Sequence, residues 1–186
     1  MKFRLLFLAS ILPLLCSCTN LVWTSKPVIT KPTDHDFHFV GKWEQLPNPR
    51  FRNDDPPYTM TITRDAETKT KYTLNSKNQP LDSKFAFTVS QHSDDPDYAI
   101  VQIRMSGIDP NYYFAYALRK EDRLYIWTIE SDKLVKLIKE TELNSVIDRG
   151  GWGTNITADP TKLLKMLTEH SVELASKQPT TYKLIQ

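Results

Sequence analysis

Cysteine is nearly absent from this 186-residue chain: it occurs only as Cys16 and Cys18, close to the start. No cysteine follows residue 18, which excludes an internal disulfide, a thiol nucleophile and a cysteine-ligated metal cluster from the rest of the chain. The domain must therefore be stable through its apolar core alone. A chain of this length with 11% aromatic residues is large enough to do so as one domain.

Excess charge and catalytic motifs are also lacking. The formal net charge is +2, and Lys2 and Arg4 account for it, so the remainder of the chain is neutral. That balance argues against nucleic-acid binding by net charge. The chain has no nucleophile elbow, His-Glu-x-x-His helix, phosphate-binding loop or dinucleotide fingerprint. We therefore predict a non-catalytic protein with no cofactor and no metal.

Long apolar runs are missing, but a short one stands at the start. Lys2 and Arg4 precede the apolar run from Leu5 to Leu15, which Pro13 interrupts. Such a run is too short to span a membrane and suits a secretory signal peptide, here residues 1–17.

The segment Leu15-Cys16-Ser17-Cys18 resembles the lipobox of bacterial lipoproteins. The resemblance implies cleavage after Ser17, a diacylglyceryl group on the sulfur of Cys18 and a third acyl chain, such as palmitate, on its amine. Cys16 fits the pattern less well because Leu15 is too large for the small site before the cysteine. Thr19, in place of an aspartate, implies the outer membrane, facing the periplasm. An ordinary cleaved signal is the alternative.

Residues 18–36 are predicted to form the lipidated N-terminus and a tether, because Pro27 and Pro32 interrupt a stretch rich in Ser, Thr and Lys. Such a coil could hold the domain roughly 50 Å from the bilayer, at ~3.1 Å per residue. Trp23 is either a stray aromatic of the linker, the interpretation that we favour, or an anchor in the membrane interface.

Period-two alternation of apolar residues dominates the chain from Phe39 to Ile129. The runs lie around residues 39–44, 58–63, 71–74, 85–90, 99–105, 112–118 and 124–129, and turn-rich pieces separate most of them. Short connections favour antiparallel hairpins. We predict one mainly β (α+β) domain over residues 37–186, either an antiparallel meander or a small lipocalin-like barrel of about seven or eight strands.

Helical spacing appears after Glu130. Asp132 is a candidate cap for a short helix carrying Leu134 and Leu137. A second, amphipathic helix is predicted at about residues 160–175, with Asp159 as N-cap and proline in the first turn. We expect it to pack on the sheet, and residues 182–185 to add a last strand.

The segment Gly41-Lys42-Trp43 resembles the Gly-x-Trp of the lipocalin superfamily, in which the tryptophan plugs the closed end of the barrel. The wider layout is similar to a family of small bacterial envelope proteins, which begin a meander with Gly41-Lys42-Trp43-Glu44 and end in a helix after a short strand, here residues 155–164. That resemblance implies no catalytic residues.

Aromatic residues provide the candidate surface for a ligand or partner. Tyr113, Tyr125 and Trp127 are expected to share one face of two adjacent strands, and Trp43 is grouped with them. Alternatively the sheet's curl and the final helix cover both faces, which is the interpretation that we favour.

Three polar clusters are candidate metal sites that we interpret otherwise. Residues 34–38 hold two histidines and two aspartates, but alternation would separate His35 from His38, so an exposed segment is favoured over a zinc or copper site. Residues 92–97 and 53–57 are interpreted as turns.

We therefore expect a lipid-anchored, non-catalytic envelope module whose partners are the membrane through Cys18, and either an envelope protein or a small apolar ligand. A lipocalin-like carrier or sensor is the first alternative. An envelope hydrolase or metal-dependent enzyme is the second.

Overall fold

The computed structural model describes residues 21–47, 57–77, 83–91, 97–104, 111–141, 143, 145–150 and 153–186. The predicted signal peptide and Cys18 lie outside these residues, so both stay predictions, and so do the turns predicted at 92–96 and 53–56. Within the described part of the chain, no helix has the length and apolar character needed to cross a bilayer.

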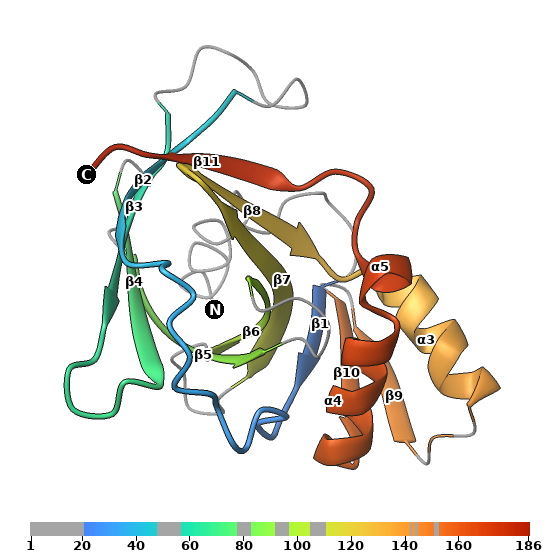
Figure 1. Cartoon of the computed structure of the whole chain (residues 1–186). Helices are drawn as coiled ribbons and strands as arrows, with labels where there is room; N and C mark the ends of the chain where they lie inside the picture. The colour runs from blue at the N-terminus through green and yellow to red at the C-terminus, as the bar shows by residue number, and fades with distance from the viewer. Residues whose placement is uncertain are drawn as a thin grey trace, which may run out of the picture.

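Eight antiparallel strands close into a barrel (Figure 1). They are β2 (Gly41–Gln45), β3 (Thr59–Arg64), β4 (Lys71–Lys77), β5 (Ser83–Gln91), β6 (Tyr98–Arg104), β7 (Tyr112–Lys120), β8 (Arg123–Thr128) and β11 (Thr180–Leu184). Strands β2 to β8 follow one another as a meander, and β11 closes the ring by pairing with both β8 and β2. The predicted mainly β class is confirmed, in its barrel form.

The alternating strands bury one face inside the barrel, as their pattern predicts. On β5, Phe85 and Phe87 are buried and Ala86 between them is exposed. On β3, Met60 and Ile62 are buried in the same way. These side chains form a core that is separate from a second one on the outer face of the barrel.

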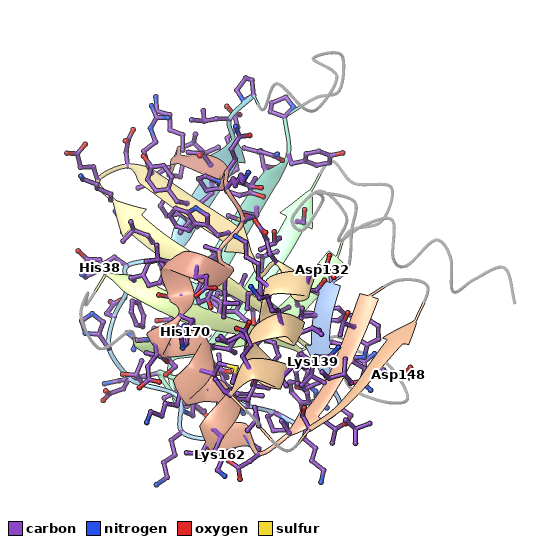
Figure 2. The ribbon with its side chains drawn as sticks, turned by 90° about the vertical axis from the view of Figure 1, so that its right-hand side faces the viewer. His38, Asp132, Lys139, Asp148, Lys162 and His170 are labelled. Carbon is purple, nitrogen blue, oxygen red and sulfur yellow. The ribbon has the colours of Figure 1, made fainter. Side chains whose placement is uncertain are left out.

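Three helices between β8 and β11 build that second core. They are α3 (Ser131–Glu140), α4 (Pro160–Glu169) and α5 (Ser171–Leu174), and they lie against the outside of the barrel (Figure 2). Tyr116 on β7 is fully buried beneath them, and its hydroxyl donates a hydrogen bond to the Leu167 carbonyl at 2.9 Å. The barrel therefore has a covered outer side.

The helix ends agree only in part with the predictions. The Asp159 carboxylate caps α4 by accepting a hydrogen bond from the Lys162 N–H at 2.9 Å, as predicted. The predicted continuation to about residue 175 is wrong, because α4 ends before His170 and the chain resumes as α5. The predicted cap Asp132 is also wrong: Glu130 is the N-cap of α3, without a side-chain bond, and Asp132 lies in the first turn.

A three-stranded extension continues the sheet beyond the barrel. Strand β1 (Leu21–Thr24) pairs antiparallel with the first residues of β7 and parallel with β10 (Gly153–Ala158), which pairs with β9 (Ser145–Gly150). The short strand before the last long helix, which the envelope-protein resemblance implies, corresponds to β10. Figure 1 shows β1 beside the barrel wall, next to β10 and β9.

The structure differs from the predicted tether over residues 21–36. Strand β1 lies in this stretch, and Val28 and Ile29 are buried. Their two N–H groups donate to the side-chain oxygen of Gln102 on β6, at 2.6 and 2.9 Å. The folded domain therefore includes residues 21–36, which the prediction assigned to the tether.

Candidate functional site

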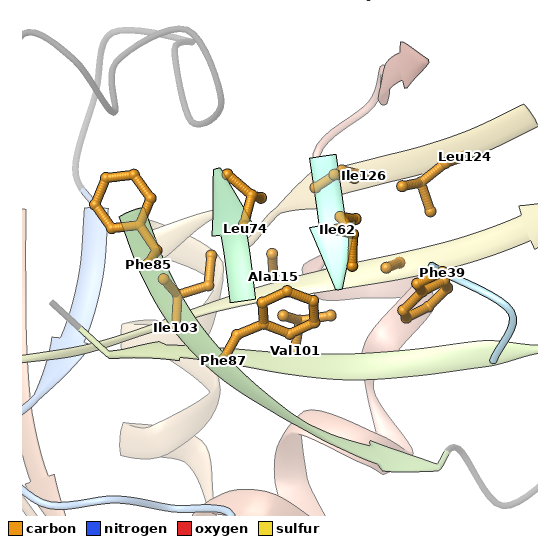
Figure 3. A pocket seen from close by; sticks show the side chains of 11 residues that line it. Phe39, Ile62, Leu74, Phe85, Phe87, Val101, Ile103, Ala115, Leu124 and Ile126 are labelled. Carbon is orange, nitrogen blue, oxygen red and sulfur yellow. The ribbon is translucent and has the colours of Figure 1, made fainter. Parts of the chain in front are cut away.

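A cavity of about 50 Å³ lies inside the barrel, and the described side chains that line it are all apolar (Figure 3). The lining residues are Phe39, Ile62, Leu74, Phe85, Phe87, Val101, Ile103, Ala115, Ala117, Leu124 and Ile126. The two alanines are neighbours on the inner face of β7, where a larger side chain would reach into the space. A cavity lined in this way offers dispersion contacts and no hydrogen bonds, so it suits hydrocarbon better than water.

Residues 33–41 close one end of the barrel, which we call the closed end. Trp43 is 0% exposed there, and its indole N–H donates to the Phe39 carbonyl at 2.8 Å. The rings of Phe37 and Phe39 stack with centroids 5.4 Å apart. Gly41 has a φ of +150°, and a Cβ there would stand 2.6 Å from a Leu184 methyl carbon, so the chain turns into β2 where only glycine fits.

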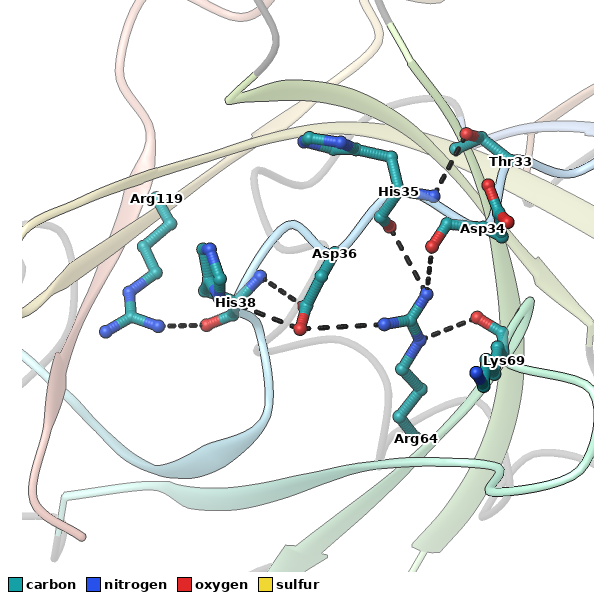
Figure 4. Close-up of polar contacts among 8 residues, drawn as sticks. All are labelled: Thr33, Asp34, His35, Asp36, His38, Arg64, Lys69 and Arg119. Atoms are coloured by element: carbon teal, nitrogen blue, oxygen red, sulfur yellow. Dashed lines mark hydrogen bonds and ion pairs between the residues drawn. The ribbon is translucent and has the colours of Figure 1, made fainter.

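Two arginines fasten this closing segment, and Arg64 is the first (Figure 4). Its guanidinium lies 5.6 Å from the ring centroid of Tyr72, donates to the carbonyl of Asp34 and pairs with the Asp36 carboxylate at 3.5 Å. It also donates to the Lys69 carbonyl at 2.6 Å. One side chain therefore joins the 64–71 turn to the closing segment.

Arg119 is the second. Its guanidinium lies over the indole ring of Trp43, 5.6 Å from the ring centroid, as in a cation–π contact. It donates to the His38 carbonyl and, at 3.1 Å, to the Glu121 carbonyl. His38 has a φ of +53°, a conformation that the clamp at its carbonyl holds.

The cavity wall continues past the far end of the barrel, where β6 ends and β7 begins. Residues that pair directly across neighbouring strands present their side chains on the same face of a sheet. The register gives one such series, which we call the inner-face row: Phe87, Ile103, Tyr113, Trp23, Asn155 and Asp148. Its first two members line the cavity, and the others lie on β7 and the extension.

The residues of the inner-face row are apolar at the cavity, aromatic at Tyr113 and Trp23, and polar at the end on the extension. The rings of Trp23 and Tyr113 are 6.1 Å apart, and both side chains are half-buried. Burial raises the pKa of the Tyr113 phenol, which a hydrogen bond to Asn111 partly offsets, so the ring is neutral at pH 7. Asn155 and the exposed Asp148 end the row.

Three buried polar atoms have no hydrogen-bond partner within the described part of the chain: Gln45 Oε1, Tyr72 Oη and Asn155 Oδ1. Gln45 lies on the inner face of β2, two residues beyond Trp43 toward the far end. Tyr72 stacks on Phe87 with centroids 5.0 Å apart, and burial raises the pKa of its phenol. A buried acceptor without a donor costs free energy, so each such atom needs an explanation.

The aromatic residues proposed from sequence do not form one surface. Trp43 is buried in the closed end, and Tyr113 lies on the inner-face row. Tyr125 and Trp127 pair with Leu118 and with the buried Tyr116, and so lie on the outer face instead. Their rings are stacked 6.0 Å apart and are half-buried. The expectation that Tyr113 shares a face with Tyr125 and Trp127 is therefore wrong.

The histidine-rich segment 34–38 belongs to the clamp of the closed end. His35 meets the ring of Phe37 edge-on at 4.8 Å, and the exposed His38 lies 3.7 Å from the Asp36 carboxylate. Among the residues that the structure describes, no group of three or more histidine, cysteine or acidic side chains could hold a metal ion. His92 lies outside the described residues.

The comparisons with known proteins add no relative: no family model, curated protein or solved structure matches this chain. The closed antiparallel barrel is compatible with a lipocalin-like fold. Membership of the lipocalins or of the small envelope-protein family stays a prediction.

Proposed function

We propose that this protein is a lipid-anchored, non-catalytic binding module of the bacterial envelope whose barrel takes a small apolar ligand. The observation that carries the proposal is the cavity inside the barrel, lined by eleven apolar residues. Of the two functions expected from the sequence, an interaction module and a carrier, the cavity favours the carrier.

The chemistry of the lining supports binding more than catalysis. None of the eleven lining side chains carries a nucleophile, an acid or a base, so an enzyme would need its reactive groups elsewhere. A hydrocarbon ligand gains roughly 0.8 kcal/mol for each methylene that it buries. Four buried methylenes would therefore contribute about 3 kcal/mol from the apolar effect alone.

The ligand proposal is tested with the mature chain carrying Cys18→Ala, which keeps the whole domain and removes the anchor. An environment-sensitive fluorescent fatty probe is titrated into the protein and then displaced by unlabelled alkanes and fatty alcohols. Saturable binding with one site, and displacement that strengthens with chain length, support the proposal. The absence of saturable binding for every apolar probe would overturn it.

The anchor is a separate part of the proposal and has its own test. Cells expressing the wild-type chain, Cys18→Ala or Cys16→Ala are fed a clickable fatty acid. Label on the wild type and on Cys16→Ala, with none on Cys18→Ala, supports lipidation at Cys18. Equal labelling of all three proteins would contradict it.

A second candidate function, binding of an envelope protein, rests on the stacked pair Tyr125 and Trp127. Half-buried aromatic side chains on an outer face are common in protein interfaces. Crosslinking in intact cells tests it: a partner that is captured by the wild type and lost with Tyr125→Ser favours this function.

A further inference from the structure

We propose that the ligand is a single-chain amphiphile taken from the bilayer that carries the anchor, and that it enters the barrel over Tyr113 and Trp23. Its hydrocarbon end lies in the cavity, and its head group, a hydrogen-bond donor, lies against Asn155. This inference rests on the proposed function and deepens it, because it names the ligand class, the route and the source.

The route follows from which end of the barrel is blocked. Residues 33–41 cover the closed end, where Trp43 and Phe37 are buried and the arginine clamps hold the chain. Among the described residues, this leaves the far end as the route by which a ligand reaches the cavity. There the inner-face row continues the cavity wall from Ile103 to Tyr113 and on to Trp23 without a change of face.

The ligand's shape follows from the size of the cavity. Its volume of about 50 Å³ is near one third of the roughly 150 Å³ that admits a benzene ring. A space of this size favours the narrow end of an unbranched chain over a fused ring system. Four strand spacings separate Phe87 from Asn155 along the row, roughly 19 Å at about 4.8 Å each, which matches the extended length of a long alkyl chain.

The head group follows from the outer end of the row. Asn155 Oδ1 is a buried acceptor with no hydrogen-bond partner among the described residues, and Asp148 stands next in the register. An acceptor followed by a negative charge favours a head group that donates hydrogen bonds, such as a hydroxyl or an ammonium, and disfavours a carboxylate. Trp23 and Tyr113 would cover the chain between the cavity and the head group.

The source follows from the position of β1 in the chain. Only five peptide steps separate Cys18 from Trp23, so their Cα atoms are at most ~18 Å apart. The predicted tether would have allowed about 50 Å. With acyl chains on Cys18, the far end of the barrel would stay close to the bilayer surface, where amphiphiles are concentrated.

The route is tested with lipidated mature protein in phospholipid vesicles that contain a bromine-labelled fatty alcohol, since bromine quenches nearby tryptophan fluorescence. We expect quenching in the wild type, loss of at least half of it in Trp23→Phe, and little change in the matched outer-face control Trp127→Phe. A long-chain carboxylate of equal length should bind at least several-fold more weakly than the alcohol, and Asp148→Asn should reduce that difference.

The source is tested by inserting twelve Gly/Ser residues between Asn20 and Leu21. We expect the rate of alcohol transfer from vesicle to protein to fall several-fold, while the affinity in detergent-free solution stays within twofold. Binding in solution combined with unchanged transfer and unchanged Trp23 quenching would overturn this inference alone. No binding of any apolar probe would instead overturn the proposed function. Thermal unfolding of each variant confirms that it is folded.

Discussion

Filling the cavity is expected to stabilise the protein and weaken ligand binding at the same time. Ala115 lies on the inner face of β7, is 1% exposed and lines the cavity. In Ala115→Val two methyl groups enter that space, on a strand where valine is favoured. A purely structural core substitution would not separate stability from binding in this way.

The expected size of each effect follows from the volume. At roughly 24 cal/mol for each Å³ of cavity removed, filling 50 Å³ raises the free energy of unfolding by up to about 1.2 kcal/mol. That increase corresponds to a rise in Tm of about 2–5 °C for a chain of this size. A ligand that loses contact equivalent to two methylenes binds about tenfold more weakly.

The assay combines thermal unfolding with displacement of the fluorescent fatty probe. Ala86→Val on the exposed face of β5 is the matched control, because it adds the same two methyl groups to a strand without reaching the cavity. The control should leave the probe affinity unchanged. A drop of several degrees in Tm for Ala115→Val, together with unaltered probe affinity, would refute the reasoning. It would mean that the cavity has no room for two methyl groups and that the probe does not bind in it.

Three further outcomes follow from the closed end and the outer core. Arg119→Ala should lower the free energy of unfolding, measured in urea, by about 2 kcal/mol, because it removes the hydrogen bond to the His38 carbonyl and the cation over the Trp43 ring. An unchanged urea midpoint would show that these contacts do not stabilise the protein. Gly41→Ala should cost about 2 kcal/mol or more, because the new Cβ meets the Leu184 side chain at a positive φ, and a wild-type Tm would contradict this. Burial raises the pKa of Tyr98 to about 12, from 10 in the unfolded chain. The neutral phenol therefore stabilises the fold fully below pH 10, and this stabilisation is lost as the pH rises from 10 to 12. A spectrophotometric titration in which all tyrosines ionise near pH 10 while the protein stays folded would contradict this prediction.

Local sequence patterns were sufficient to predict the strands of the barrel. Alternation marks a strand because the two faces of β5 differ so strongly, with Phe85 and Phe87 inside and Ala86 outside. The start of α4 could also be predicted from the sequence, because the capping residue Asp159 lies only three residues before Lys162, whose N–H donates to its carboxylate. Such features depend on neighbours in sequence.

Pairing between distant segments could not be read in the same way. Strand β1 has four residues in a proline-interrupted stretch, and the partners that stabilise it lie about 90 and 130 positions later. Strand β9 was missed because Val146 and Ile147 are adjacent, so no alternation appears. The omission of β1 turned part of the domain into a supposed tether.

The prediction of the candidate site failed because alternation within one strand does not show which of its faces matches a given face of the neighbouring strand. Alternation separates Tyr112 from Tyr113, but only the register shows which of them shares a face with Trp127. The contact between Arg119 and Trp43 joins positions 76 apart and leaves no local signal. The conclusion that Trp43 occupies the closed end did come from the Gly-x-Trp resemblance, and its complete burial agrees with that role.

Native mass spectrometry of the mature protein, released gently from the membrane of its host, tests the central claim most directly. The account predicts a population that carries one additional non-covalent mass of a single-chain amphiphile, which is strongly reduced in Ala115→Val and persists in Ala86→Val. A spectrum that shows only the lipidated chain, for the wild type and for both variants, would contradict it.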